Sequence, residues 1–92
     1  MRLRIECIIK TNRYDPHDRI HTIGGKYDSG TPWRMPQQEA ISGILSGIYS
    51  FYVHVGTMTV DVIVATHLGH NYIKTRNDGL HPDNLLSLQS CV

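Results

Sequence analysis

The sequence predicts an α+β domain in which a single antiparallel sheet of about five strands, in the order ββαβββ, carries one amphipathic helix on one face. Residues 49–64 alternate between apolar and polar side chains, which is typical of half-buried strands. Residues 40–48 place apolar side chains at helical spacing instead. Because 92 residues leave room for only one core, we expect residues 1–92 to form one domain.

The N-terminal part predicts two paired strands. Residues 2–10 alternate apolar and polar side chains and form the first strand. The Asp15-Pro16 step predicts a turn, and a second strand is expected over residues 17–23, ended by Gly24-Gly25. Residues 26–36 are expected to form a loop, because two prolines and a glycine interrupt any period there.

One helix is predicted to begin at Pro36 and to end at Gly47. Proline suits the first turn, where no N–H is needed, and Glu39 lies where the helix dipole favours an anion. Gly43 either permits close packing or is merely tolerated, at a cost of about 1 kcal/mol relative to alanine. The apolar stripe of this helix consists of Ala40, Ile41, Ile44, Leu45 and Ile48. The polar side opposite to it consists of Gln37, Gln38, Ser42 and Ser46.

Residues 49–75 predict a three-stranded antiparallel meander. A two-residue turn at Gly56-Thr57 pairs Val55 with Met58 and places apolar side chains opposite one another on one face. A second tight turn at Leu68-Gly69 pairs the next two strands. The leucines that follow near the C-terminus are expected to pack over the edge of the core as an extended segment or a short helical turn.

The other face of this meander, which we call the reverse face, mixes aromatic, imidazole and charged groups. Asp61 is expected to lie between Tyr52 and Arg76, where opposite charges stabilise strand pairing. This face is either a solvated surface or a surface for binding and oligomerisation. Its members are Ser50, Tyr52, His54, Asp61, Ile63, Ala65, His67, His70, Tyr72, Lys74 and Arg76.

Composition restricts the partners. A net charge of +1 and a pI of about 7.9 argue against nucleic acid as a partner. No apolar run reaches the length of a membrane span, so we expect a cytoplasmic protein without a membrane partner. In that compartment Cys7 and Cys91 are expected as reduced thiols. Because so small a domain has a modest core, we expect a homo-oligomer.

Seven runs of residues carry a resemblance to known proteins: Ile20 to Gly25, Gly30 to Trp33, Glu39 to Ile41, Tyr49 to Val55, Val64 to His67, Tyr72 to Thr75 and Asn84 to Leu88. They resemble a family of small bacterial and phage-associated proteins that is classed only as a domain of unknown function. The resemblance extends over most of the chain and implies a compact α+β domain, without an activity, cofactor or catalytic residue.

The leading functional hypothesis is a non-enzymatic module that captures a phosphate-bearing, nucleotide-like ligand. In the loop after Gly25, Lys26 supplies charge, Trp33 a stacking surface and Arg34 a bidentate fork. Alternatively, Trp33 fills the core. The remaining candidate contacts lie on the reverse face: Tyr52, His54, Tyr72, Lys74 and Arg76. In a phage, such a module could act in counter-defence by sequestering an immune signalling nucleotide.

Other functions have weaker support. An interaction or structural module would use the reverse face to contact another protein or its own copy. A small hydrolase would use His54 with Asp61 as an acid/base pair. A zinc site would use the pairs His67 with His70 or His17 with His21, but no further ligand is evident. Because the sequence contains no motif for nucleophiles, metal ligands or phosphate loops, we predict no catalytic residue, no metal ligand and no cofactor.

Overall fold

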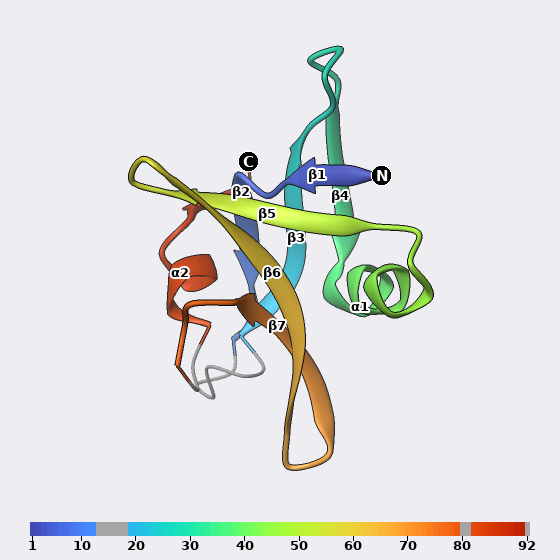
Figure 1. The fold of residues 1–92 in the computed structure, drawn as a ribbon, viewed down its shortest axis with the longest axis vertical. Coiled ribbons are helices and arrows are strands. Elements are labelled where there is room, and N and C mark those ends of the chain that lie inside the picture. The colour runs from blue at the N-terminus through green and yellow to red at the C-terminus, as the bar shows by residue number, and fades with distance from the viewer. Residues whose placement is uncertain (13–18, 80–81, 92) are drawn as a thin grey trace.

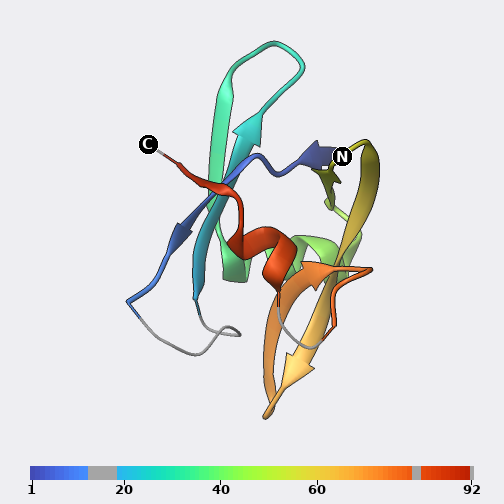
Figure 2. The ribbon, with the colours of Figure 1, turned by 90° about the vertical axis from the view of Figure 1, so that its left-hand side faces the viewer.

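The computed structural model describes residues 1–12, 19–79 and 82–91 and shows an α+β fold, as predicted. The prediction of a single five-stranded sheet is wrong, because the described strands form two four-stranded sheets that face each other (Figure 1, Figure 2). The first sheet has the order β1 (Arg2–Arg4), β5 (Ser50–Val55), β6 (Met58–His67) and β7 (His70–Thr75). The second has the order β4 (Pro32–Pro36), β3 (Ile20–Lys26), β2 (Cys7–Lys10) and β8 (Gln89–Ser90).

The predicted first strand is divided between the two sheets. Strand β1 pairs in parallel with β5, whereas β2 pairs antiparallel with β3, as expected. At the crossing point, the N–H of Ile5 donates to the Tyr52 carbonyl in one sheet, and the N–H of Glu6 donates to the Gly24 carbonyl in the other. Ile5 is buried between the sheets. The apolar alternation therefore continues through the crossing and reads as one strand in the sequence.

Two predictions are wrong in the hairpin formed by β3 and β4. Strand β3 continues through both glycines to Lys26, and the predicted loop contains strand β4. Proline is tolerated in β4 because this strand lies at the edge of its sheet. The residues expected to turn between the first two strands, and the beginning of the predicted second strand, lie outside the described part of the chain.

Helix α1 (Gln37–Ser46) confirms the predicted boundaries, with Pro36 as N-cap residue and Gly47 in the left-handed conformation as C-cap. The helix contacts strands of both sheets. Its buried side is therefore the one that carries Gln37, Ala40 and Ile41. The predicted stripe is therefore wrong at one edge: Leu45 is 66% and Ile48 is 61% exposed.

Gly43 has a packing role that explains its place in mid-helix. A Cβ atom here would overlap the ring of Tyr49, whose side chain packs against the core. The N–H of Tyr49 also donates to the Gly43 carbonyl at 3.0 Å. Because Gly43 has no side chain, the ring of Tyr49, the residue before β5, can approach the helix backbone closely.

The predicted meander is confirmed in its register. Strands β5 and β6 pair Val55 with Met58 and Tyr52 with Asp61, and β6 and β7 pair Ala65 with Tyr72. The expected cross-strand ion pair is wrong in its partner, because the Asp61 carboxylate accepts from Arg2 on β1. A strand on the far side of β5, which the meander alone cannot predict, supplies this cation.

The core lies between the sheets and includes Ile8 and Ile23 from one sheet and Phe51 and Ile73 from the other. Helix α2 (Asp83–Leu86) closes one side by inserting the fully buried Leu85, which confirms the predicted short helical turn. In Figure 2, α2 lies between the two sheets. In the described residues, no helix is long and apolar enough to cross a membrane.

Hydrogen bonds fix α2 to the end of β7. The buried hydroxyl of Thr75 lies 2.9 Å from the side-chain oxygens of Asn77 and Asp78, and it accepts a hydrogen bond from Asn84 Nδ2 at 2.8 Å. Two of the runs that carry the family resemblance, around Thr75 and Asn84, therefore meet in a structural contact.

The C-terminal segment is also tied covalently, because Cys7 and Cys91 form a disulfide with an S–S distance of 1.99 Å. The expectation of reduced thiols is therefore wrong. The two cysteines are 84 residues apart, but the pairing of β8 with β2 brings their Cα atoms to 4.9 Å. The cytoplasmic location, which rested on other grounds, stays a prediction.

Candidate functional site

The candidate site is a pocket of about 300 Å³ beside strand β1, which we call the β1 pocket. Strand β1 crosses the β3–β4 hairpin below its turn, and the turn projects beyond it (Figure 1). The pocket is lined by side chains from three places: β1, the hairpin turn and β5. Its cations are Arg2, Arg4 and Lys26, its aromatic residues are Tyr27 and Tyr52, and Asp28 and Ser29 complete its polar lining.

Two neighbours hold the guanidinium of Arg2. Its Nη2 donates to Asp61 Oδ1 at 2.8 Å, and its Cζ lies 4.6 Å from the centre of the Tyr52 ring. The Tyr52 ring in turn lies 5.8 Å from the imidazole of His54. A guanidinium has five N–H donors in a planar fork, so Arg2 is oriented by these contacts and still has donors for an anion.

The two other cations stand on strands that approach each other closely. Arg4 on β1 lies 4.0 Å from Glu6, and Lys26 at the end of β3 is exposed. The strands can cross because Gly25 has no side chain, since a Cβ there would overlap the Arg4 carbonyl oxygen. Gly25 therefore brings the cation of the β3–β4 hairpin next to the cations of β1.

The aromatic groups of the β1 pocket differ in exposure. Tyr27, at the hairpin turn, is 40% exposed, and Tyr52 is half-buried beneath Arg2. Tyrosine offers a flat apolar face together with a hydroxyl group, which suits contact with a ring that also carries polar atoms. The pocket thus combines stacking surfaces with three cations.

The predicted loop residues lie around a second pocket of about 250 Å³, which we call the disulfide pocket. Lys26, Trp33 and Arg34 all line it, and Lys26 is shared with the β1 pocket. The prediction of Trp33 as a stacking surface is wrong: the side chain is only 5% exposed, and its ring lies 5.8 Å from that of Phe51 in the core. The alternative, that Trp33 fills the core, is confirmed.

The predicted contacts on β7 are not brought into either pocket. Tyr72 is only 4% exposed, so it offers no surface for stacking. Lys74 donates from Nζ to the carbonyls of Asp78 and Gly79, at 3.2 and 2.8 Å, and so fixes the following turn. Arg76 is exposed, and its N–H donates to the Asp61 carbonyl at 2.8 Å.

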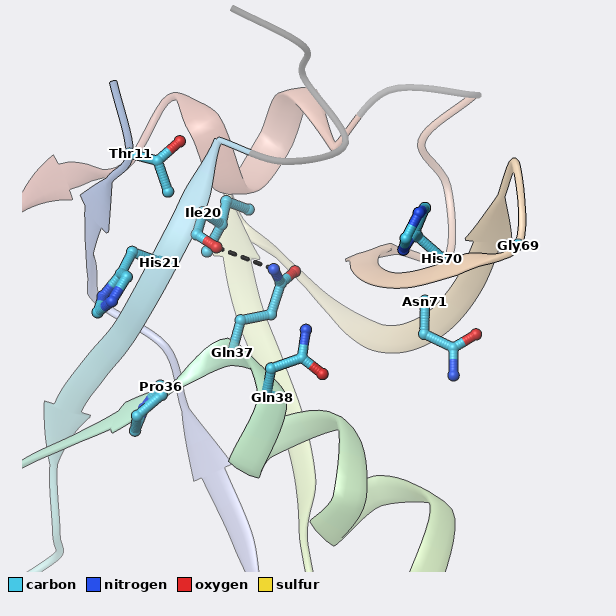
Figure 3. A pocket seen from close by; sticks show the side chains of 9 residues that line it. All are labelled: Thr11, Ile20, His21, Pro36, Gln37, Gln38, Gly69, His70 and Asn71. Atoms are coloured by element: carbon cyan, nitrogen blue, oxygen red, sulfur yellow. Dashed lines mark hydrogen bonds between the residues drawn. The ribbon is translucent and has the colours of Figure 1, made fainter. Parts of the chain in front are cut away.

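A third pocket of about 390 Å³ opens at the beginning of α1 (Figure 3). His21 on β3 and His70 on the β6–β7 hairpin lie on opposite sides of it (Figure 3). Gln37 forms its floor and connects the sheets: Nε2 donates to the Ile20 carbonyl at 2.8 Å, and Oε1 accepts from the Ile73 N–H at 3.1 Å. The expectation that Gln37 belongs to the polar side of the helix is therefore wrong, because both ends of its amide replace missing backbone partners.

The histidine pairs do not assemble a metal site in the described residues. His67 and His70 are a cross-strand pair, as predicted, while His17 lies outside the described ranges. Within residues 1–12, 19–79 and 82–91, no three histidine, cysteine or acidic side chains are grouped to hold a metal ion. Asp61, the expected partner of His54 in an acid/base pair, is engaged by Arg2.

Among the cations and aromatic residues of the β1 pocket, three were missed by reasoning from the sequence: Arg2, Arg4 and Tyr27. The two arginines alternate with core residues on the first strand, which indicated an outward direction but not a neighbour. Their position beside Tyr52 depends on the parallel pairing of β1 with β5, which joins residues about half the chain apart.

Comparison with known proteins gives a family and no activity. Searches of curated proteins and of solved structures found no match to the chain. A family model with the description "Protein of unknown function (DUF3892)" matches residues 4–89, which includes every described element except the beginning of β1 and the end of β8. The chain therefore belongs to the DUF3892 family, whose members have no assigned function.

Proposed function

We propose that this protein is a non-enzymatic module that binds a small ligand with a phosphate group and an aromatic ring, such as a nucleotide, in the β1 pocket. The observation that supports the proposal is the convergence of Arg2, Arg4 and Lys26 with Tyr27 and Tyr52 around one pocket of about 300 Å³. Cations and flat aromatic surfaces are the two components that nucleotide binding needs. The volume lies at the lower end of the range for small-molecule pockets, which suits a mononucleotide or one half of a larger nucleotide.

Each group has a part in the proposed complex. Arg2 is held by Asp61 and Tyr52, so little side-chain freedom is lost when it receives a phosphate oxygen. Arg4 and Lys26, which also line the pocket, supply two further charges for the phosphate. Tyr27 stacks on the base from the hairpin turn. Asp28, also at this turn, repels a phosphate, so the phosphate is proposed to lie beside Arg2.

Binding without turnover amounts to sequestration when the protein is present in excess of its ligand. For a signalling nucleotide, capture by this pocket would lower the free concentration that its receptor detects. We therefore propose sequestration of an immune signalling nucleotide as the biological role in a phage. The proposal involves no catalytic residue and no cofactor.

The test is calorimetric titration of the purified protein with a panel of mononucleotides and dinucleotides, with adenosine and inorganic phosphate as partial ligands. We expect a nucleotide to bind, and each partial ligand to bind more weakly. R4Q removes a charge-assisted hydrogen bond worth about 1.5–3 kcal/mol and should weaken binding about tenfold or more. Y27A should weaken it similarly through lost stacking.

The matched control is R76Q, which removes the same charge at a residue that was predicted to contact ligand but does not line the β1 pocket. Binding to R76Q should equal that of the wild type. Failure of every nucleotide in the panel to bind, or equal loss in R4Q and R76Q, would refute the proposal.

A homo-oligomeric interaction module is the second candidate, and one observation favours it. Leu45 and Ile48 are large apolar side chains that the sequence pattern placed in the core, yet they are mostly exposed at the end of α1. A second copy that covers this surface would remove both side chains from water. The doubly substituted variant L45Q/I48Q should then be monomeric where the wild type is a dimer; a monomeric wild type excludes this candidate.

A further inference from the structure

The Cys7–Cys91 disulfide lies at a different pocket from the one that is proposed to bind a nucleotide. Cys7 on β2 and Cys91 after β8 together line the disulfide pocket, and Cys7 is half-buried. Gly25 on β3 and Pro32 on β4 also line the pocket. A Cβ at Gly24 would lie 3.0 Å from each sulfur, so the disulfide packs directly on the backbone of β3.

The charges around the disulfide favour an anion. Lys26 and Arg34 line the pocket, and both are exposed. Glu6 also lines it, but its carboxylate lies 4.0 Å from Arg4, whose positive charge offsets it. A reactant that enters with a negative charge therefore meets an excess of cations on its way to the sulfurs.

We infer that the Cys7–Cys91 disulfide is a site of thiol–disulfide exchange with small anionic thiols, which Lys26 and Arg34 draw into the disulfide pocket. The reactant class is a low-molecular-mass thiol that carries a carboxylate. The disulfide pocket shares Lys26 with the β1 pocket, but Arg34 and the two cysteines line only the disulfide pocket.

The reaction balances in two steps. A thiol first loses its proton to water, and its thiolate attacks Cys7 Sγ; the S–S bond to Cys91 breaks, a mixed disulfide forms on Cys7, and the Cys91 thiolate takes up a proton. A second thiolate then attacks the sulfur of the bound thiol. The small-molecule disulfide leaves, and Cys7 is left as a thiol after protonation. Two electrons have passed from two small thiols to the protein.

Exchange at this bond changes how the C-terminal segment is held. When the disulfide is reduced, the C-terminal segment is still held by the two-residue pairing of β8 with β2 and by the burial of Leu85. The redox state of the surrounding thiol pool therefore sets how firmly α2 and β8 are attached.

The experiment compares three small thiols of similar size on the folded, oxidised protein at low ionic strength: 3-mercaptopropionate, 2-mercaptoethanol and cysteamine. Intact mass after acid quenching measures the rate. Each rate is divided by the thiolate concentration and by the rate of the same thiolate with an uncharged small disulfide, which cancels differences in intrinsic nucleophilicity. We expect mercaptopropionate to react about fourfold faster than mercaptoethanol, the effect of one unit charge at about 5 Å in water, and cysteamine to react slowest. Salt should reduce these differences.

Substitutions identify the cations. R34Q leaves Lys26 as the remaining attracting cation and should lower the ratio of mercaptopropionate to mercaptoethanol rates, whereas K26Q/R34Q should bring it close to one. R76Q, the matched control, should keep the wild-type ratio. Circular dichroism verifies that both variants are folded. Tryptic peptides should carry the adduct on the segment from Ile5 to Lys10.

Three results would overturn the inference: equal rates for the three thiols, an unchanged ratio in R34Q, or a disulfide that exchanges only in denaturant. Nucleotide binding by the same R34Q protein reports on the β1 pocket separately. Failure of one proposal therefore does not decide the other.

Discussion

Replacing both Cys7 and Cys91 by serine should lower the free energy of unfolding by about 4.5 kcal/mol. The disulfide joins residues that are 84 positions apart and so closes almost the whole chain into one loop. For a loop of this length, the chain-entropy relation for the unfolded state gives about 4.5 kcal/mol at room temperature. Proteins commonly have about 0.05–0.15 kcal/mol of stability per residue, or about 5–14 kcal/mol for this chain. The loss is therefore a large part of the total.

Urea unfolding followed by circular dichroism measures this effect. The oxidised wild type should unfold at a much higher urea concentration than the C7S/C91S variant, and its melting temperature should be higher by about 20–35 °C. Reductant should bring the wild type to the midpoint of the variant and leave the variant unchanged. If oxidised wild type and variant differ by less than about 1 kcal/mol, the reasoning from loop closure is refuted.

Two substitutions test the packing of α1. Q37M leaves two buried backbone groups without partners, at about 1–3 kcal/mol each, so its melting temperature should fall clearly; Q38M, at an exposed neighbour, serves as the control. G43A should destabilise the protein by about 1–3 kcal/mol because its methyl group overlaps the Tyr49 ring, although alanine is the better helix former. A neutral or stabilising G43A, or equal losses in Q37M and Q38M, contradicts the observed packing.

Features that depend on near neighbours could be predicted from the sequence. The turn at Gly56-Thr57 and the alternation around it determine the register of β5 and β6, because a slip of one residue would expose the apolar face. Pro36 and Gly47 mark the ends of α1 through backbone preferences that act within one turn. The small α+β class follows from these elements.

The second sheet could not be predicted, because it depends on distant pairings. One continuous alternation describes β1 and β2 equally well whether the strand stays in one sheet or crosses to another. The prolines of β4 are compatible with a loop or with an edge strand, and the neighbour of the strand decides between them. The disulfide was missed because reduced cysteines were expected from the predicted cytoplasmic location. In the structure, the pairing of β2 with β8 brings the two cysteines together.

The candidate site was predicted only in part for the same reason. Lys26 and Tyr52 were both expected to contact ligand, but no pattern in the sequence indicated that they line the same pocket. Strand β1 joins them, since it pairs with β5 and crosses β3. Tyr72 and Lys74 have the same residue types, but Tyr72 is buried and Lys74 donates to the turn that follows β7.

The most direct test of the proposed function is an amide NMR titration of the isotope-labelled protein with the tightest-binding nucleotide of the panel. We predict that the amide signals of Arg2, Arg4, Lys26, Tyr27 and Tyr52 shift in proportion to binding, while those of Lys74 and Arg76 stay in place. Absence of any shift at saturating nucleotide, or shifts confined to β7 and the pocket at the beginning of α1, would contradict a ligand site at β1.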